Sequence, residues 1–221
     1  MKLAISGASG KTGSRIAEEG LKARNQVRLL VRESSVVPDN LSQCEKRVIS
    51  LGNSASLDKA LQGCDALVIA TGARPSIDLT GPARIDAFGV RNQVASCKRV
   101  GVKRVLLVSS LCTGRLIHPL NLFGLILMWK RVGERSLEES GLDWTVIRPG
   151  GLNEREENLE REGIRYTGPD MQKDMYIPRR LVAQCCLEAI NTNSSIGKII
   201  EITSGENVPT VKLDNAIKEF R

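Results

Sequence analysis

A glycine-rich segment near the start of the sequence is well suited to bind an anion. Gly7, Gly10 and Gly13 stand directly after the apolar run Leu3–Ser6 and open the amphipathic segment Thr12–Ala23. This order is typical of a strand, a tight turn and a helix N-terminus, where unpaired N–H groups and the helix dipole attract phosphate. Because glycine also lets the backbone approach a pyrophosphate, the segment predicts a dinucleotide site.

Two other interpretations of this loop stay open. The stretch Gly10-Lys11-Thr12 is similar to the end of a mononucleotide-binding P-loop, but that motif needs a glycine at the position of Ile5. No later predicted strand ends in an acidic residue that could hold magnesium, which argues against a nucleotide hydrolase. The second alternative is a turn with a structural role only.

The residues after the next predicted strand, Val27–Val31, bear on the choice of dinucleotide. An NAD enzyme places Asp or Glu about 20 residues past the glycine motif, where the carboxylate bonds a ribose hydroxyl. This chain has Arg32 there, whose guanidinium can bond a 2′-phosphate together with the hydroxyls of Ser34 and Ser35. NADP(H) is therefore predicted over NAD(H). Glu33 reverses that preference if it faces the ribose, and Arg32 is then an ordinary surface cation.

Strand-length apolar runs alternate with helical patterns, which predicts βαβ units around a parallel sheet. Strands are expected at Leu3–Ser6, Val27–Val31, Arg47–Leu51, Ala66–Ala70, Val105–Ser109, Trp144–Ile147 and Lys198–Ile202. Helices are expected at Thr12–Ala23, Ser56–Leu61, Pro82–Arg99, Leu122–Glu139, Arg179–Ile190 and Val211–Phe220. A length of 221 residues fits one domain. The predicted fold class is α/β, with a Rossmann-type doubly wound parallel sheet in a single domain spanning residues 1–221.

The region 152–177 is expected to form a small cap or loop, because residues 153–173 are charged and poor in apolar side chains. Such a cap would lie above the carboxyl edge of the sheet, where open α/β sheets bind ligands.

Composition narrows the classes of partner. The net charge of +7 suits a phosphorylated cofactor, an anionic surface or an acidic protein alike. Aromatic residues make up 3% and no recognition motif is present, so nucleic-acid binding is not expected. Six cysteines without a C-x-x-C pair, and the single His118, argue against a metal site and favour buried thiols. The longest apolar run, Leu122–Trp129, is too short to cross a bilayer.

Three segments carry a family resemblance. They are the loop Gly7–Gly13, the stretch Val108-Ser109-Ser110, and residues 144–151, which read Trp-Thr-Val-Ile-Arg-Pro-Gly-Gly. Together they resemble the atypical short-chain dehydrogenase/reductases of the NAD(P)H-binding, NmrA-like group, over nearly the whole chain. Within that group, residues 78–86, 120–123, 129–131 and 139–142 are most similar to the NADP-binding domains of redox-sensing components of the chloroplast inner-envelope import machinery. The resemblance implies a homologue from a photosynthetic organism.

The resemblance also implies residues that line the cofactor beside the three glycines. Distributed over the ends of several strands, these are Ser9, Lys11, Thr12, Ala70, Thr71, Gly72, Ser109, Pro149 and Gly150. Asn53 stands where relatives carry an aspartate beside the adenine, and its amide can still bond the adenine edge.

The chain departs from the family pattern at the catalytic pair. Short-chain dehydrogenases carry Tyr-x-x-x-Lys on the helix after the fifth strand, one turn apart, and the tyrosine transfers the proton. Lys130 matches the lysine, but Ile126 stands at the tyrosine position, and Tyr166 and Tyr176 lie in or beside the cap region. Ordinary carbonyl reduction is therefore not expected. Lys130 is expected to contact the cofactor ribose, and Ser110 and Lys130 are the candidate catalytic residues.

Two functions are compatible with these features. The first is an NADP(H)-binding redox sensor or assembly factor that contacts a protein or a membrane surface through Asn121–Trp129, a segment apolar on every face. Burial of this segment against the sheet is the alternative. The second function is NADPH-dependent reduction of a flavin, a bilin or another conjugated small molecule by direct hydride transfer. Val31–Ser35 and Glu139–Leu142 resemble small flavin and biliverdin reductases.

The expected location is the cytoplasm, with peripheral contact to a photosynthetic membrane left open. The sequence opens with a predicted strand, so no signal or transit peptide is expected.

Overall fold

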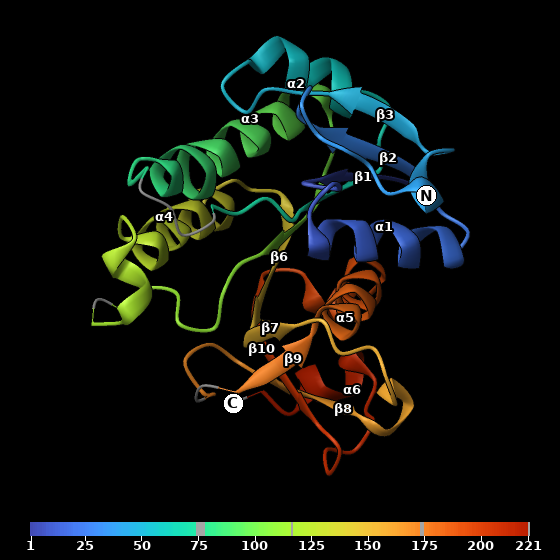
Figure 1. Cartoon of the computed structure of the whole chain (residues 1–221), viewed down its shortest axis with the longest axis vertical. Coiled ribbons are helices and arrows are strands. Elements are labelled where there is room, and N and C mark those ends of the chain that lie inside the picture. Colours follow the sequence, from blue (N-terminus) through green and yellow to red (C-terminus); the bar gives the residue numbers. More distant parts are fainter. Residues whose placement is uncertain (74–77, 116, 173–174, 221) are drawn as a thin grey trace.

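An eight-stranded sheet organises the described part of the chain, as the computed structural model in Figure 1 shows for residues 1–73, 78–115, 117–172 and 175–220. Its order is β3-β2-β1-β4-β5-β6-β10-β8. The strands are β1 (Lys2–Ser6), β2 (Gln26–Val31), β3 (Glu45–Val48), β4 (Ala66–Ile69), β5 (Arg104–Val108), β6 (Asp143–Pro149), β8 (Gly163–Thr167) and β10 (Lys198–Gly205). All neighbouring strands pair in parallel except β8, which pairs antiparallel with β10. The order reverses between β1 and β4, so the prediction of a doubly wound Rossmann-type sheet is confirmed.

Helices cover both faces of this sheet. On one face α1 (Lys11–Lys22) packs against α5 (Arg179–Asn191), and on the other α3 (Val90–Val100) packs between α2 (Ser54–Leu61) and α4 (Ile126–Glu138) (Figure 1). The smaller elements are η1 (Asp39–Leu41), η2 (Ala83–Gly89), η3 (Pro119–Leu122), η4 (Leu159–Arg161), η5 (Asn193–Ser195), α6 (Leu213–Lys218) and the paired strands β7 (Gly151–Asn153) and β9 (Tyr176–Pro178).

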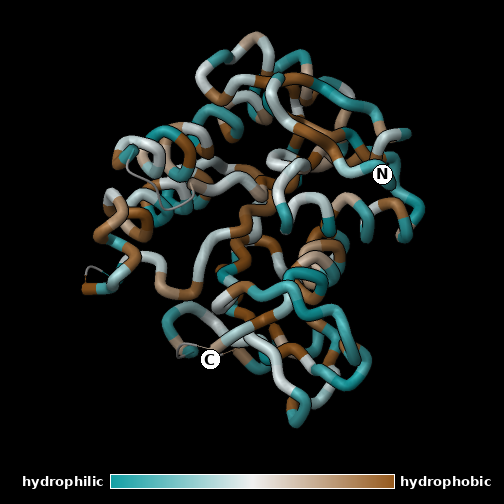
Figure 2. Tube along the Cα trace, viewed as in Figure 1, coloured by the Kyte–Doolittle hydropathy of each residue, from teal (hydrophilic) through white to brown (hydrophobic). Residues whose placement is uncertain are grey.

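The strands are apolar on both faces because each face is covered. In β4, Val68 belongs to the core shared with α1 and α5, whereas its neighbours Leu67 and Ile69 belong to the core shared with α2 and α3. Successive strand residues point to opposite faces, so one apolar run fills two cores. In Figure 2 these hydrophobic strands lie between the helical layers.

The third strand begins and ends earlier than its predicted bounds, Arg47–Leu51. It spans Glu45–Val48, and Glu45 pairs in register with Arg28 of β2. Arg28 Nε lies 2.9 Å from Glu45 Oε2, so an ion pair fixes the start of a strand whose own apolar content is low.

The predicted helix Leu122–Glu139 begins too early. Gly124 and Leu125 have φ values of +79° and +57°, and α4 starts only at Ile126. A Cβ on Gly124 would lie 2.4 Å from the carbonyl oxygen of Leu79, so close approach of a second segment selects a glycine and breaks the helix there. Asn121 then joins the turn to α4 by accepting the N–H of Leu127 at 3.0 Å.

The apolar stretch before and within α4 is divided between core and surface. Ile126 and Leu127 are buried, whereas Leu122, Phe123 and Leu125 are exposed. Neither alternative for this stretch therefore holds throughout. Among the described residues, the helices are too short or too polar to cross a membrane.

The expected cap region contains more regular structure than predicted. Its β8 extends the main sheet, with Tyr166 paired opposite Ile202 of β10, while β7 and β9 form a separate pair at the end of β6. Residues 173 and 174 of this region lie outside the described residues. The buried carboxylate of Glu201 accepts the backbone N–H groups of residues 170–172 at 2.8–3.1 Å, which ties the region to β10.

Candidate functional site

The glycine loop is packed too tightly for other residue types. Gly7 has φ +83°, and a Cβ there would lie 2.8 Å from the carbonyl oxygen of Ala70, so the loops after β1 and β4 touch. Gly10 caps α1 without a side-chain hydrogen bond, and no acidic residue stands in the first turn. The first N–H groups of α1 are therefore available to an anion at the carboxyl edge of the sheet.

Cations at the start of α1 are held by carboxylates from the segment after β7. Lys11 pairs with Glu154 and Arg15 with Glu156. The hydrogen bond from Lys11 lowers the pKa of Glu154 below its ordinary value, although both side chains are about half exposed. Solvent-exposed pairs of this kind are weak, so a phosphate can replace Glu154 as the partner of Lys11.

A polar recess lies beside the loop after β4. It is lined by Thr71, Asp86 of η2, Ser109 at the end of β5, and Lys130 of α4. Lys130 Nζ lies 2.8 Å from Asp86 Oδ1, and Asp86 Oδ2 accepts the N–H of Ala73 at 3.1 Å. The Lys130 side chain is 15% exposed and that of Asp86 2%. Lys130 is therefore a partly buried, paired cation rather than a surface lysine.

The hydroxyl of Thr71 has no partner among the described residues, although it is buried. A buried polar group left unpaired costs about 1–3 kcal/mol, so this atom is suited to bond a ligand. With the glycine loop next to it and the Lys130 ammonium in the same recess, the residues present fit a dinucleotide whose pyrophosphate would be held by the N-terminus of α1.

The ends of β5 and β6 meet at the same edge. Ser109 N–H donates to the carbonyl of Ile147 at 2.7 Å and Leu111 N–H to that of Pro149 at 2.9 Å. The Ser109 hydroxyl lies 3.1 Å from that of Thr113, while Ser110 is partly exposed. Beside them, a Cβ on Gly150 would lie 2.2 Å from the carbonyl oxygen of Met175. The predicted residues of β1, β4, β5 and β6 are thus brought to one edge.

The two predicted residues nearer the adenine side stand apart from this recess. Arg32 follows β2, is exposed, and has no side-chain partner among the described residues, and Glu33 is exposed beside it. Asn53 caps α2, with Oδ1 accepting the N–H of Ser56 at 3.0 Å. Its oxygen is committed to the helix, so contact with the adenine through its amide nitrogen stays a prediction.

No tyrosine replaces the missing phenol at the family position. Ile126 is 4% exposed and packs in the interior. Tyr166 lies in a separate cavity, where burial and its hydrogen bond to Glu188 raise the pKa of the phenol above its ordinary value. Tyr176 is exposed at the start of β9, with its ring 2.6 Å from the position of a Cβ on Gly151 of β7.

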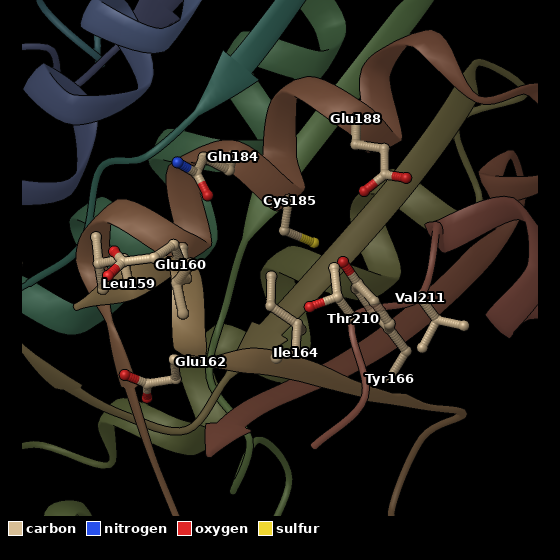
Figure 3. A pocket seen from close by; sticks show the side chains of 12 residues that line it. Leu159, Glu160, Glu162, Ile164, Tyr166, Gln184, Cys185, Glu188, Thr210 and Val211 are labelled. Atoms are coloured by element: carbon tan, nitrogen blue, oxygen red, sulfur yellow. The ribbon is translucent and has the colours of Figure 1, made fainter. Parts of the chain in front are cut away.

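The separate cavity, of about 280 Å³, lies between α5, β8 and residues 210–211 (Figure 3). Its lining includes Glu160, Glu162 and Glu188 and no lysine or arginine. Three carboxylates without a cation do not suit the phosphates of a dinucleotide. The carboxyl edge therefore suits a dinucleotide better than this cavity does.

Asp86 is the residue of the recess that sequence reasoning missed. It lies within the segment 78–86 that carries the family resemblance, but nothing in the sequence pairs it with Lys130, 44 residues away.

The sequence matches the NAD(P)H-binding family over residues 7–193. The chain belongs to this family. An uncharacterised chloroplast protein of Arabidopsis thaliana is 32% identical, over 94% of this chain and 78% of that protein. The sanguinarine reductase of Eschscholzia californica is 28% identical, over 90% and 88%. TIC 62 of Arabidopsis is 30% identical over 98% of this chain, which spans only 38% of that longer protein. The NmrA-like resemblance is thereby confirmed.

Solved structures agree on the fold. A proposed NAD-dependent epimerase/dehydratase from Bacillus halodurans superposes with a TM-score of 0.85 at 24% identity, covering 99% of both chains. An anaerobilin reductase from Escherichia coli O157:H7 does so with a TM-score of 0.77 at 19% identity, covering 95% of this chain and 100% of that one. A short-chain dehydrogenase/reductase from Veillonella parvula, with a TM-score of 0.73 and 16% identity over 96% and 97%, was solved with NADP.

Proposed function

We propose that this protein is an NADPH-dependent reductase that delivers hydride directly to a conjugated small molecule. The observation that carries the proposal is the recess of Thr71, Asp86, Ser109 and Lys130 beside the glycine loop. It offers a fixed cation and a free hydroxyl next to the expected cofactor, but no phenol at the family position. A conjugated acceptor suits such a site because it spreads the charge that hydride addition produces.

The relatives support a reductase over a redox sensor that binds NADP(H) without turnover. The chain aligns with 88% of a plant sanguinarine reductase, and its fold matches that of an anaerobilin reductase. Both of those proteins are named for reduction of a larger organic molecule. The TIC 62 proteins of chloroplasts, in contrast, extend well beyond the region that this chain matches.

NADP(H) is the proposed cofactor in preference to NAD(H). Arg32 is exposed directly after β2, at the position where an NAD enzyme carries Asp or Glu, and it forms no ion pair among the described residues. A free guanidinium at this place can take a 2′-phosphate bidentately.

Steady-state oxidation of NADPH tests the function, with flavin mononucleotide and biliverdin as acceptors. Turnover with either acceptor supports the reductase. Tight binding of NADPH in a fluorescence titration, with no turnover of either acceptor, would contradict it.

A second candidate function is redox sensing through three exposed apolar residues, which are Leu122 at the end of η3 and Phe123 and Leu125 between η3 and α4. They favour contact with a protein or membrane surface. Sedimentation with anionic phospholipid vesicles in NADP⁺ and in NADPH, compared with Leu122→Ser, tests this role. Equal sedimentation in both redox states would count against it.

A further inference from the structure

The ion pair of Lys130 and Asp86 suggests how a chain without the family tyrosine could supply a proton. We infer that Lys130 is the proton donor of the reduction and that Asp86 is the residue that positions it. This inference rests on the proposed reductase function. The proton would then come from Lys130 Nζ and not directly from solvent.

The backbone fixes the position of Asp86 closely. Asp86 lies in η2, a π-helical turn, and such turns occur often at functional sites. A Cβ on Gly133 of α4 would lie 2.1 Å from the carbonyl oxygen of Asp86, so the backbones of η2 and α4 are in direct contact. The carboxylate is held further by the N–H of Ala73, at 3.1 Å. Lys130 therefore bonds a carboxylate whose position is fixed by the contact of η2 with α4 and by the N–H of Ala73.

The Lys130 ammonium lies next to the loop after β4, at the carboxyl edge of the sheet. A Cβ on Gly72 would lie 3.5 Å from Lys130 Nζ, and Gly72 belongs to the loop after β4 that touches the glycine loop through Ala70. The unpaired hydroxyl of Thr71 lines the same recess. An acceptor molecule that stacks at this edge would place its polar atoms within reach of both groups.

Other charges near Lys130 are already paired with each other. On α4, Glu134 is bonded by Arg131 at 3.1 Å and by Arg148 of β6 at 2.7 Å. The groups that line the recess from β4 and β5 are uncharged. Within the described residues, Asp86 is thus the carboxylate that bonds Lys130.

When bound, NADPH would supply a hydride, which would form a C–H bond on a neutral conjugated acceptor and leave a negative charge on a terminal oxygen or nitrogen of the acceptor. One Nζ–H bond of Lys130 then breaks and its proton moves to that atom, while Asp86 stays ionised. Water returns a proton to the neutral amine. A cationic acceptor, in contrast, becomes neutral when it takes the hydride and needs no proton.

The two kinds of acceptor separate proton donation from cofactor binding. We would compare NADPH-dependent reduction of menadione, a neutral quinone, with that of 10-methylacridinium, a cation, in the unaltered protein and in Lys130→Met and Asp86→Asn. The ratio of the two rates cancels any common loss of cofactor binding, which a fluorescence titration of NADPH measures separately. Lys103→Met, an exposed lysine outside the recess, is the matched control.

Lys130→Met is expected to lower the menadione-to-methylacridinium ratio by about 10²–10⁴-fold, the usual contribution of general acid catalysis. Asp86→Asn should lower the ratio less, because the ammonium remains but loses its carboxylate partner. Lys130→Arg, which keeps the charge beside Asp86 but is a poor acid, should behave like Lys130→Met and guards against misfolding of the methionine variant. Lys103→Met should leave the ratio unchanged.

Equal losses with both acceptors would show that Lys130 serves cofactor binding alone and would overturn the inference. A selective loss of menadione reduction in Tyr176→Phe, with Lys130→Met unchanged, would move the proton to the exposed phenol and overturn it as well. Reduction of neither acceptor by the unaltered protein, despite measurable NADPH binding, would instead overturn the proposed function, and the inference with it.

Discussion

A Cβ atom on Gly13 would lie 2.2 Å from the carbonyl oxygen of Gly7. The first turn of α1 thus presses on the end of β1 with no room for a side chain, and the pyrophosphate is expected on the other side of this contact. At Gly10 the same oxygen would be 3.2 Å away, a tight but less severe contact.

Substitutions in this loop should separate cofactor binding from folding. Gly10→Val is expected to abolish NADPH binding while the domain still folds, because a branched side chain occupies the pyrophosphate space and resists the turn. Calorimetric titration and thermal unfolding measure the two properties. Gly168→Ala, where a Cβ would meet nothing within 4 Å, is the control. Retained affinity in Gly10→Val would mean that the loop is a structural turn only.

Arg32→Ala should discriminate between the two nicotinamide cofactors. Loss of a charge-assisted bond to the 2′-phosphate is expected to weaken NADPH binding by about 1.5–3 kcal/mol and to leave NADH binding nearly unchanged. Equilibrium titration of both cofactors tests this, with the exposed Lys98→Ala as the control. Equal affinity of the unaltered protein for NADPH and NADH would contradict the assignment.

The buried pair of Arg148 and Glu134 should matter for stability. Arg148 is 3% exposed and Glu134 fully buried, with Nε–Oε1 and Nη2–Oε2 distances of 3.0 and 2.7 Å. Glu134→Gln removes the carboxylate that bonds Arg148 at two atoms and leaves only Asp170 and Glu201, at 3.4 and 3.7 Å, beside the buried guanidinium, so the free energy of unfolding should fall by about 3 kcal/mol. Urea unfolding is the measurement. The exposed pair of Arg47 and Glu45 offers a comparison, and Arg47→Ala should cost far less.

Acid should destabilise the start of β3 through Glu45. Hydrogen bonds from Arg28 and then Lys2 lower the pKa of this carboxyl from 4.5 to about 2. Because the folded-state pKa is depressed, the contribution to stability is present above pH 4.5 and is lost as the pH falls toward 2. Above this window, Glu45→Gln should therefore lower the free energy of unfolding by an amount that does not change with pH. Within the window, the stability of the variant should fall less steeply with pH than that of the unaltered protein. Urea unfolding across the window tests this, and an unchanged slope would exclude Glu45 as a contributor.

The parts of the fold that sequence predicted depend on local signals. The glycine loop, the apolar strands and the proline at the start of α5 each carry a pattern within a few residues of themselves. The start of α4 at Ile126 carries no such local signal. Gly124 adopts its conformation because the backbone passes close to Leu79, which is 45 positions earlier. The strand β8 was missed because it carries only two apolar side chains, Ile164 and Tyr166, and its place in the sheet is set by backbone pairing with β10, which is distant in sequence.

The candidate site was predictable to the same extent. Residues that follow strands could be placed at one edge from the strand order alone. The pair of Lys130 and Asp86 could not, because it requires a π-helical turn and the contact of Gly133 with that turn. The role of Asn53 as the cap of α2 is local, because its Oδ1 accepts the N–H of Ser56, three residues later. That bond occupies the oxygen that could otherwise contact the adenine.

The carboxylates of Glu154 and Glu156 also bear on how fast the cofactor arrives. Because they neutralise Lys11 and Arg15 at the mouth of the glycine loop, the long-range field there is weaker than the net charge of +7 suggests. Electrostatic steering depends on such a field and is screened by salt. The association rate of NADPH should therefore change little with ionic strength, and removing Glu154 should make that rate both faster and more sensitive to salt.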